Sequence, residues 1–160
     1  MILTYLGLGT NLGDRLENLR AARAALPPDV TVLQASPIYE TAPWGYTHQL
    51  AFLNQVIEAE TSLAPLALLA YVKKLETNLG RTPTFRYGPR LMDIDILLYG
   101  DLVIDLPDLS IPHPRLPERA FMLVPLADLA PDRIQPGPTQ KTTRQLLEGV
   151  DRTGVKEFHG

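Results

Sequence analysis

Cysteine is absent from the sequence of 160 residues. Its absence excludes disulfide bonds, thiolate metal sites and cysteine nucleophiles, so any metal or catalytic site must use oxygen and nitrogen groups. A large excess of basic residues is also missing, since the formal net charge is −3 and charged residues make up 21% of the chain. This balance lacks the positive surface of a protein that binds nucleic acid non-specifically, so we expect no nucleic-acid partner.

Long apolar runs are missing as well. No stretch is long enough to cross a bilayer, and the first residues carry neither a basic segment nor a small-residue cleavage site. We therefore expect a cytoplasmic protein without a membrane partner. The chain does contain 45% hydrophobic residues. That content suits one compact core and predicts a single domain over residues 1–160.

Hydrophobic periodicity predicts alternating strands and helices. Pro65 and Gly80 mark the two ends of the second helix. The expected order is strand 2–8, helix 12–26, strands 30–39 and 52–60, helix 65–80, strand 91–99, a Gly100-Asp101 turn into a hairpin partner at 102–104, and a mostly helical tail with its clearest helix at 142–147. This order predicts an α+β fold with a ferredoxin-like βαββαβ core, in which helices cover one face of an antiparallel sheet.

The strand at 91–99 places two carboxylates on one face. Its alternation predicts Met92, Ile94, Ile96 and Leu98 on one side, and Asp93, Asp95, Leu97 and Tyr99 on the other. Aspartate is depleted in strands, and two like charges on one face repel each other. The pair therefore needs solvent, a cationic side chain or a bound cation.

Magnesium fits the aspartate pair because it prefers hard oxygen ligands and keeps waters and substrate phosphates in its coordination shell. Arg81, Arg86 and Arg90 precede the pair, and arginine forks pair well with phosphate oxygens. Together these residues favour phosphoryl transfer. Taken without its neighbours, the pair can equally be the solvated face of a strand.

The stretch from Arg86 to Leu97, RYGPRLMDIDIL, resembles the signature of the hydroxymethyldihydropterin pyrophosphokinases. Further segments resemble that family in the same order along the chain. They are Gly9-Thr10-Asn11-Leu12, Thr41-Ala42-Pro43-Trp44-Gly45, Phe52-Leu53-Asn54, Pro112-His113-Pro114 and Arg119-Ala120-Phe121-Met122-Leu123. The resemblance therefore covers nearly the whole chain.

The resemblance implies an ATP-dependent diphosphokinase of folate biosynthesis. Such an enzyme moves the β,γ-diphosphate of MgATP to the hydroxymethyl group of 6-hydroxymethyl-7,8-dihydropterin and releases AMP. Two magnesium ions are implied, with Asp93 and Asp95 as their ligands. The partners are then two small molecules, and we expect a monomer or a weak homo-oligomer.

The resemblance also implies a role for individual residues. The catalytic set is Asp93, Asp95, Arg81 and Arg90. The ATP-binding set is Glu76, Arg81, Arg90, Ile96, Ser110, His113 and Arg119. The pterin-binding set is Thr41, Ala42, Pro43, Trp44, Phe52, Asn54, Tyr87, Asp93 and Phe121.

Several of these residues have a simpler interpretation when the resemblance is set aside. Glu76 can be a solvated helix charge, His113 can fix a loop between two prolines, and Asn54 can be a turn residue. Phe52 and Phe121 can be core aromatics. The sequence also departs from the family at positions where Tyr87, Asp108 and Pro114 replace a usual tryptophan, arginine and tyrosine.

Two other functions remain open from the residues alone. One is a non-catalytic ferredoxin-like module that binds a nucleotide. The other is a different magnesium-dependent phosphotransferase, because an aspartate pair with arginines does not choose the acceptor.

Overall fold

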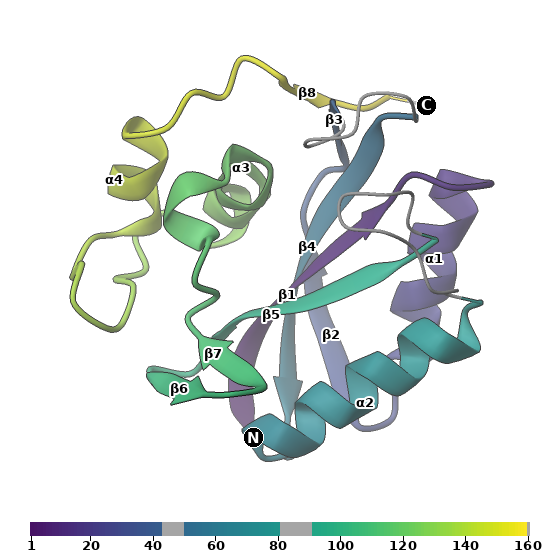
Figure 1. The fold of residues 1–160 in the computed structure, drawn as a ribbon, viewed down its shortest axis with the longest axis horizontal. Helices are drawn as coiled ribbons and strands as arrows, with labels where there is room; N and C mark the ends of the chain where they lie inside the picture. The colour runs from purple at the N-terminus through teal and green to yellow at the C-terminus, as the bar shows by residue number, and fades with distance from the viewer. Residues whose placement is uncertain (43–49, 81–90, 160) are drawn as a thin grey trace.

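The computed structural model describes residues 1–42, 50–80 and 91–159. Figure 1 shows a twisted sheet with helices on both faces and a small hairpin beside it. The elements are β1 Ile2–Thr10, α1 Arg15–Ala25, β2 Val30–Ala35, β3 Tyr39–Thr41, β4 Phe52–Thr61, α2 Pro65–Asn78, β5 Asp93–Tyr99, β6 Ile104–Leu106, β7 Leu109–Ile111, a 3₁₀ turn Leu116–Glu118, α3 Ala120–Leu129, α4 Thr143–Glu148 and β8 Val155–Glu157.

The main sheet has the order β5-β1-β4-β3-β8, and β2 also pairs with β4. All of these pairings are antiparallel. If β2 and β3 are counted as one broken strand, the order is that of a ferredoxin-like βαββαβ core. The predicted fold class is confirmed.

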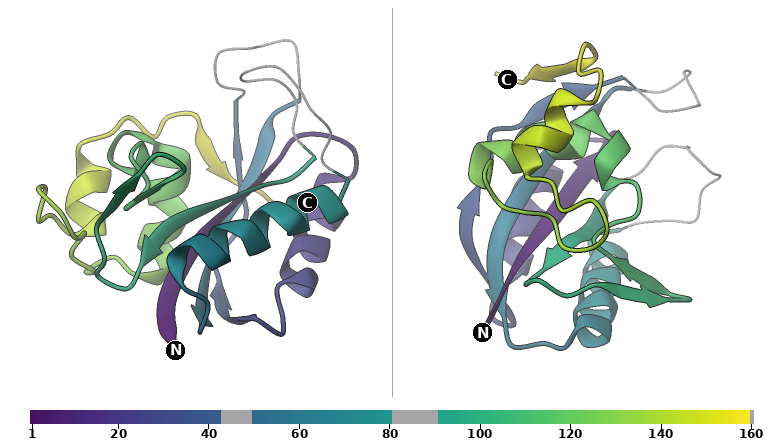
Figure 2. Two further views of the ribbon diagram at one scale, coloured as in Figure 1. Left: turned by 60° about the horizontal axis from the view of Figure 1, so that its bottom comes forward. Right: turned by 90° about the vertical axis from the view of Figure 1, so that its left-hand side faces the viewer.

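Helices pack on both faces of the sheet (Figure 2). On one face, α1 and α2 cover Leu6, Leu8 and Leu53 and form the larger apolar cluster. On the other face, α3 and α4 pack against Tyr5 and Leu97, among others. The prediction of helices on one face holds for α1 and α2, and the helical tail covers part of the opposite face.

Helix boundaries follow ordinary capping rules. The Asp14 carboxylate accepts a hydrogen bond from the Glu17 backbone N–H at 3.2 Å and caps α1. Pro65 begins α2, where its missing N–H has no cost. Thr142 and Gln145 form a capping box at α4. None of the helices in the described part of the chain is long and apolar enough to span a membrane.

Two predicted strand details are wrong. The strand expected at 30–39 is divided into β2 and β3, because Pro37 lies between them and cannot donate a ladder hydrogen bond. The segment expected to pair back onto β5 after Gly100 does not do so. Instead β6 pairs with β7, and the two form a separate hairpin.

The alternation predicted for β5 holds as far as Leu97. The β1–β5 register shifts so that Leu6 pairs with Ile96 and Tyr5 pairs with Leu98, which leaves Leu97 in a bulge. The extra residue reverses the faces that follow. Leu98 therefore joins the cluster under α3, and Tyr99 joins the cluster under α1 and α2.

Candidate active site

The centre of the candidate site is a strip across β4, β1 and β5. Gly9 of β1 pairs with Asn54 on one side and with Asp93 on the other. One step along the same face, Gly7 pairs with Val56 and with Asp95. Neighbouring strands lie about 4.8 Å apart, so two glycines without side chains separate the carboxylates from β4. Gly7 and Gly9 thus form a floor without side chains between β4 and the two aspartates of β5.

A cavity of about 610 Å³ lies over this floor and continues around the edge of the sheet at β5. It has the volume of a site for small molecules. Two groups of residues line it, one on each side of the carboxylates. Beside β4 these include Thr41, Ala42, Phe52, Asn54 and Phe121, and beside α2 and β7 they include Leu69, Lys73, Glu76, Ser110 and His113.

All the predicted site residues that the structure describes line this one cavity. They come from β3, β4, α2, β5, β7, the segment before α3 and α3 itself. They are Thr41, Ala42, Phe52, Asn54, Glu76, Asp93, Asp95, Ile96, Ser110, His113, Arg119 and Phe121. Pro43, Trp44, Arg81, Tyr87 and Arg90 lie outside the described residues, and their predicted roles stay predictions.

Asn54 is fixed before any ligand arrives. Its amide nitrogen donates a hydrogen bond to the Thr41 hydroxyl at 2.8 Å, and both side chains are buried. This bond orients the amide oxygen toward Gly9, where an added Cβ would lie 3.1 Å from it. The pair therefore presents a rigid polar edge beside the glycine floor.

Glu76 is buried and holds the strand that carries the aspartates. Its carboxylate accepts a hydrogen bond from the Ile94 backbone N–H at 2.7 Å. Ile94 lies between Asp93 and Asp95, and in the described chain β5 has a strand partner on one side only. The carboxylate of Glu76 thus satisfies an N–H on the outer edge of β5. The simpler interpretation of Glu76 as a solvated helix charge is wrong.

His113 is neutral in this environment. Burial and the nearby guanidinium groups of Arg119 and Arg115 lower the pKa of His113 to about 4. Its Nδ1 accepts a hydrogen bond from the Arg115 backbone N–H at 3.1 Å. The neutral ring therefore carries its proton on Nε2. The backbone N–H of His113 also donates to Leu97 at 3.0 Å, which ties the residue to the bulge of β5.

Arg119 and Phe121 contact each other at the start of α3. The guanidinium carbon lies 5.5 Å from the centre of the Phe121 ring, within the range of a cation–π contact. Both residues line the cavity. The ring supplies an apolar surface, and the guanidinium supplies a positive charge.

Asp93 and Asp95 supply two carboxylates to the cavity, which is fewer than a closed metal site has. Among the described residues, no three His, Asp or Glu side chains converge to hold a metal ion. Asp93 and Asp95 offer hard oxygen donors above a floor without side chains, which leaves room for further ligands. Magnesium accepts this arrangement because it keeps waters and substrate phosphates as ligands.

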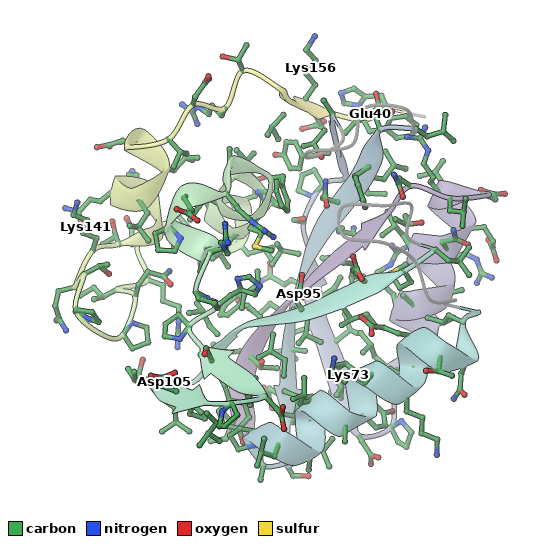
Figure 3. The ribbon with its side chains drawn as sticks, in the orientation of Figure 1. Glu40, Lys73, Asp95, Asp105, Lys141 and Lys156 are labelled. Atoms are coloured by element: carbon green, nitrogen blue, oxygen red, sulfur yellow. The ribbon has the colours of Figure 1, made fainter. Side chains whose placement is uncertain are left out.

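The sequence argument assigned no role to several lining residues, among them Lys73, Gly7 and Gly9. Lys73 lies one helical turn before Glu76 and reaches the cavity from α2 (Figure 3). That i, i+3 spacing was visible in the sequence, but the sequence argument did not assign Lys73 a role. Gly7 and Gly9 also gave a signal, since glycine inside a strand often marks close approach of another group.

Gly9 provides a direct test of the open floor. We expect Gly9→Ala to weaken binding of the ring-bearing substrate about tenfold, or about 1.4 kcal/mol, because Asn54 is held by Thr41 and cannot move away. Gly154→Ala is the matched control, since Gly154 lies outside the cavity and an added Cβ there would meet nothing within 4 Å. Titration calorimetry with both variants checks this, and equal affinities in the two would contradict it.

Fold and site together define a class of protein. The fold is a ferredoxin-like sheet, and the cavity at its edge has the size of a site for small molecules. The sequence model of 7,8-dihydro-6-hydroxymethylpterin-pyrophosphokinase (HPPK) matches residues 5–131. The chain belongs to this family and is a pyrophosphokinase of folate biosynthesis.

Curated relatives agree along the chain. The 2-amino-4-hydroxy-6-hydroxymethyldihydropteridine pyrophosphokinase of Bacillus subtilis is 44% identical over 98% of this chain and 95% of its own length. The protein of the same name from Pseudomonas aeruginosa is 44% identical over 98% of this chain and 96% of its own length. The similarity therefore includes the tail beyond residue 131.

Solved structures show the same fold. A Plasmodium falciparum HPPK-DHPS structure with pteroate has a TM-score of 0.76 and 17% identity over 92% of this chain. The chain spans 44% of that longer protein. At this identity the similarity concerns the fold alone.

Proposed function

We propose that this pyrophosphokinase binds two magnesium ions at Asp93 and Asp95 and uses them to transfer the β,γ-diphosphate of MgATP to the hydroxymethyl group of 6-hydroxymethyl-7,8-dihydropterin, with release of AMP. The observation that carries the proposal is the position of the two carboxylates between the two halves of one cavity. A phosphate donor in one half and an alcohol in the other then meet above β5.

The half beside β4 suits the pterin. Its floor at Gly7 and Gly9 is flat enough for a planar ring, and Phe52 and Phe121 supply apolar surfaces for stacking. The amide of Asn54 can both donate to and accept from the heterocycle. Thr41 and Ala42 form the adjoining wall.

The half beside α2 and β7 suits ATP. Ile96, Ser110 and Glu76 line it together with Lys73. The neutral His113 offers its Nε2–H to a phosphate oxygen, and Arg119 offers a charge-assisted pairing. These groups hold the triphosphate in place and stabilise negative charge that develops during transfer.

The reaction balances as a single displacement. The hydroxymethyl oxygen forms a bond to the β-phosphorus, the bond from that phosphorus to the oxygen of AMP breaks, and the alcohol proton is released. Asp93 and Asp95 would hold the magnesium, which when bound would neutralise the phosphates and lower the pKa of the alcohol. The chain's own contribution is to place the two substrates in line.

The nucleotide product tests this function. With MgATP and the pterin alcohol we expect AMP and pterin diphosphate in equal amounts, measured by phosphorus NMR. A pterin that carries a methyl group in place of the hydroxymethyl group is the matched control and should yield no AMP. ADP as the product, or AMP from the methyl pterin, would contradict the proposal.

A further inference from the structure

Arg15, at the start of α1, joins two segments that are separated in sequence by the undescribed residues 43–49. One guanidinium nitrogen donates to the Glu40 carboxylate at 2.9 Å and to the backbone oxygen of Ala51 at 2.8 Å. Glu40 precedes the gap, and Ala51 follows it. One side chain therefore holds both flanking segments at a fixed separation.

Other contacts converge on the same place. The Asn11 side chain donates to the Leu50 backbone oxygen at 3.0 Å. The guanidinium carbon of Arg15 lies 5.6 Å from the centre of the Phe158 ring, just past β8. The Phe158 backbone N–H donates to Ile38 at 2.8 Å. Only 22% of the Arg15 side chain is exposed, so these contacts are partly shielded from solvent.

The cluster lies behind the wall of the cavity beside β4. Neighbouring residues of a strand point to opposite faces, and in β3 Glu40 points to Arg15 while Thr41 lines the cavity. Thr41 in turn accepts the hydrogen bond that orients Asn54. Figure 3 shows Glu40 at the end of the sheet, apart from Asp95. The cluster is therefore linked, through Glu40, Thr41 and Asn54, to the half of the cavity beside β4.

We propose that Arg15, with Glu40 as its partner, is a positioning residue for the pterin half of the site. Arg15 does not line the cavity. It holds β3 and the start of β4 so that Thr41 and Asn54 keep the geometry that selects the pterin ring. This inference rests on the proposed function, because it requires the pterin to bind beside Asn54.

The variant Arg15→Met tests the inference. Methionine keeps the length of the stem and has a helix propensity close to that of arginine, so the change removes the guanidinium alone. We expect the Kd for the pterin, measured by calorimetry with magnesium and a non-hydrolysable ATP analogue, to rise about tenfold, as for a loss of about 1.4 kcal/mol. The Kd for the ATP analogue with magnesium should change by less than about twofold, because the cluster faces the pterin half only.

Arg20→Met is the matched control. Arg20 lies on the same helix and pairs with Glu17 at the surface, with 61% of its side chain exposed, so its removal should change neither affinity. Glu40→Ala gives a second test. It should weaken pterin binding by a smaller factor, since Arg15 keeps its hydrogen bond to the backbone oxygen of Ala51. Glu40→Gln keeps a hydrogen-bond acceptor and should restore most of the affinity.

The outcomes separate the two proposals. If Asn54→Ala weakens pterin binding but Arg15→Met does not, Arg15 has no positioning role. If Arg15→Met weakens binding of the pterin and of the ATP analogue equally, Arg15 contributes only to general stability and the inference is wrong. If Asn54→Ala leaves pterin affinity unchanged, the pterin does not bind beside Asn54 and the proposed function fails first.

Discussion

Replacing Asp95 by asparagine is expected to lower kcat about a thousandfold, which corresponds to about 4 kcal/mol of lost transition-state stabilisation. Asparagine keeps the volume of aspartate but removes the charge on the face of β5 that lies over Gly7. A neutral amide is a poor magnesium ligand, so charge on the transferring phosphates stays uncompensated. The KM for the pterin should change little, because Asn54 and the aromatic walls are untouched.

Single-turnover kinetics over a range of magnesium concentrations measure this effect. High magnesium should restore only part of the rate, since the remaining carboxylate of Asp93 holds the metal poorly alone. Asp105→Asn is the matched control. Asp105 is an exposed aspartate on the β6–β7 hairpin, away from Asp95 in Figure 3. A kcat for Asp95→Asn within tenfold of the unmodified enzyme would contradict the metal-ligand assignment.

The acidic pair could be predicted from the sequence because it depends only on the local geometry of one strand. In a strand, residues i and i+2 point to one face, and two carboxylates there need a compensating group. The resemblance then identified residues as distant in sequence as Thr41 and His113, and the structure places both at the same cavity. The fold followed from the order of periodic segments, since a βαββαβ order has few antiparallel solutions.

The features that sequence reasoning missed depend on tertiary contacts. The bulge at Leu97 reverses the face of Leu98. No residue type in the segment 91–99 predicts this bulge. The hairpin of β6 with β7 replaced the predicted return after Gly100, because short apolar segments do not specify their strand partner. The β3–β8 pairing joins residues more than a hundred positions apart in the sequence, which local patterns cannot predict.

The position of Glu76 at the cavity was predicted, but its hydrogen bond to β5 was not. The resemblance placed it near the nucleotide, and it lines the half of the cavity where we propose that ATP binds. Its observed hydrogen bond, however, goes to the backbone between the two aspartates. The sequence could not reveal this bond, because a helical position at 76 and a strand position at 94 become neighbours only when α2 packs on β5.

We therefore expect Glu76→Ala to lower kcat about a hundredfold, the size of effect that a displacement of about 1 Å in an active site produces. Removal of the carboxylate leaves the Ile94 N–H without this acceptor, at a cost of about 1–3 kcal/mol. The edge of β5 then loosens, and the two aspartates lose their fixed spacing. The magnesium concentration needed for half-maximal rate should rise together with the fall in kcat.

Glu76→Gln separates positioning from nucleotide contact. Glutamine keeps a side-chain oxygen that can accept the Ile94 N–H, so its kcat should stay within about fivefold of the unmodified enzyme, consistent with one retained neutral hydrogen bond. The affinity for ATP, measured without magnesium, should be the same in both variants. If both variants instead lose ATP affinity equally, the carboxylate acts on the nucleotide. Its bond to Ile94 would then be incidental, because the strand would hold the aspartates through its pairing with β1 alone.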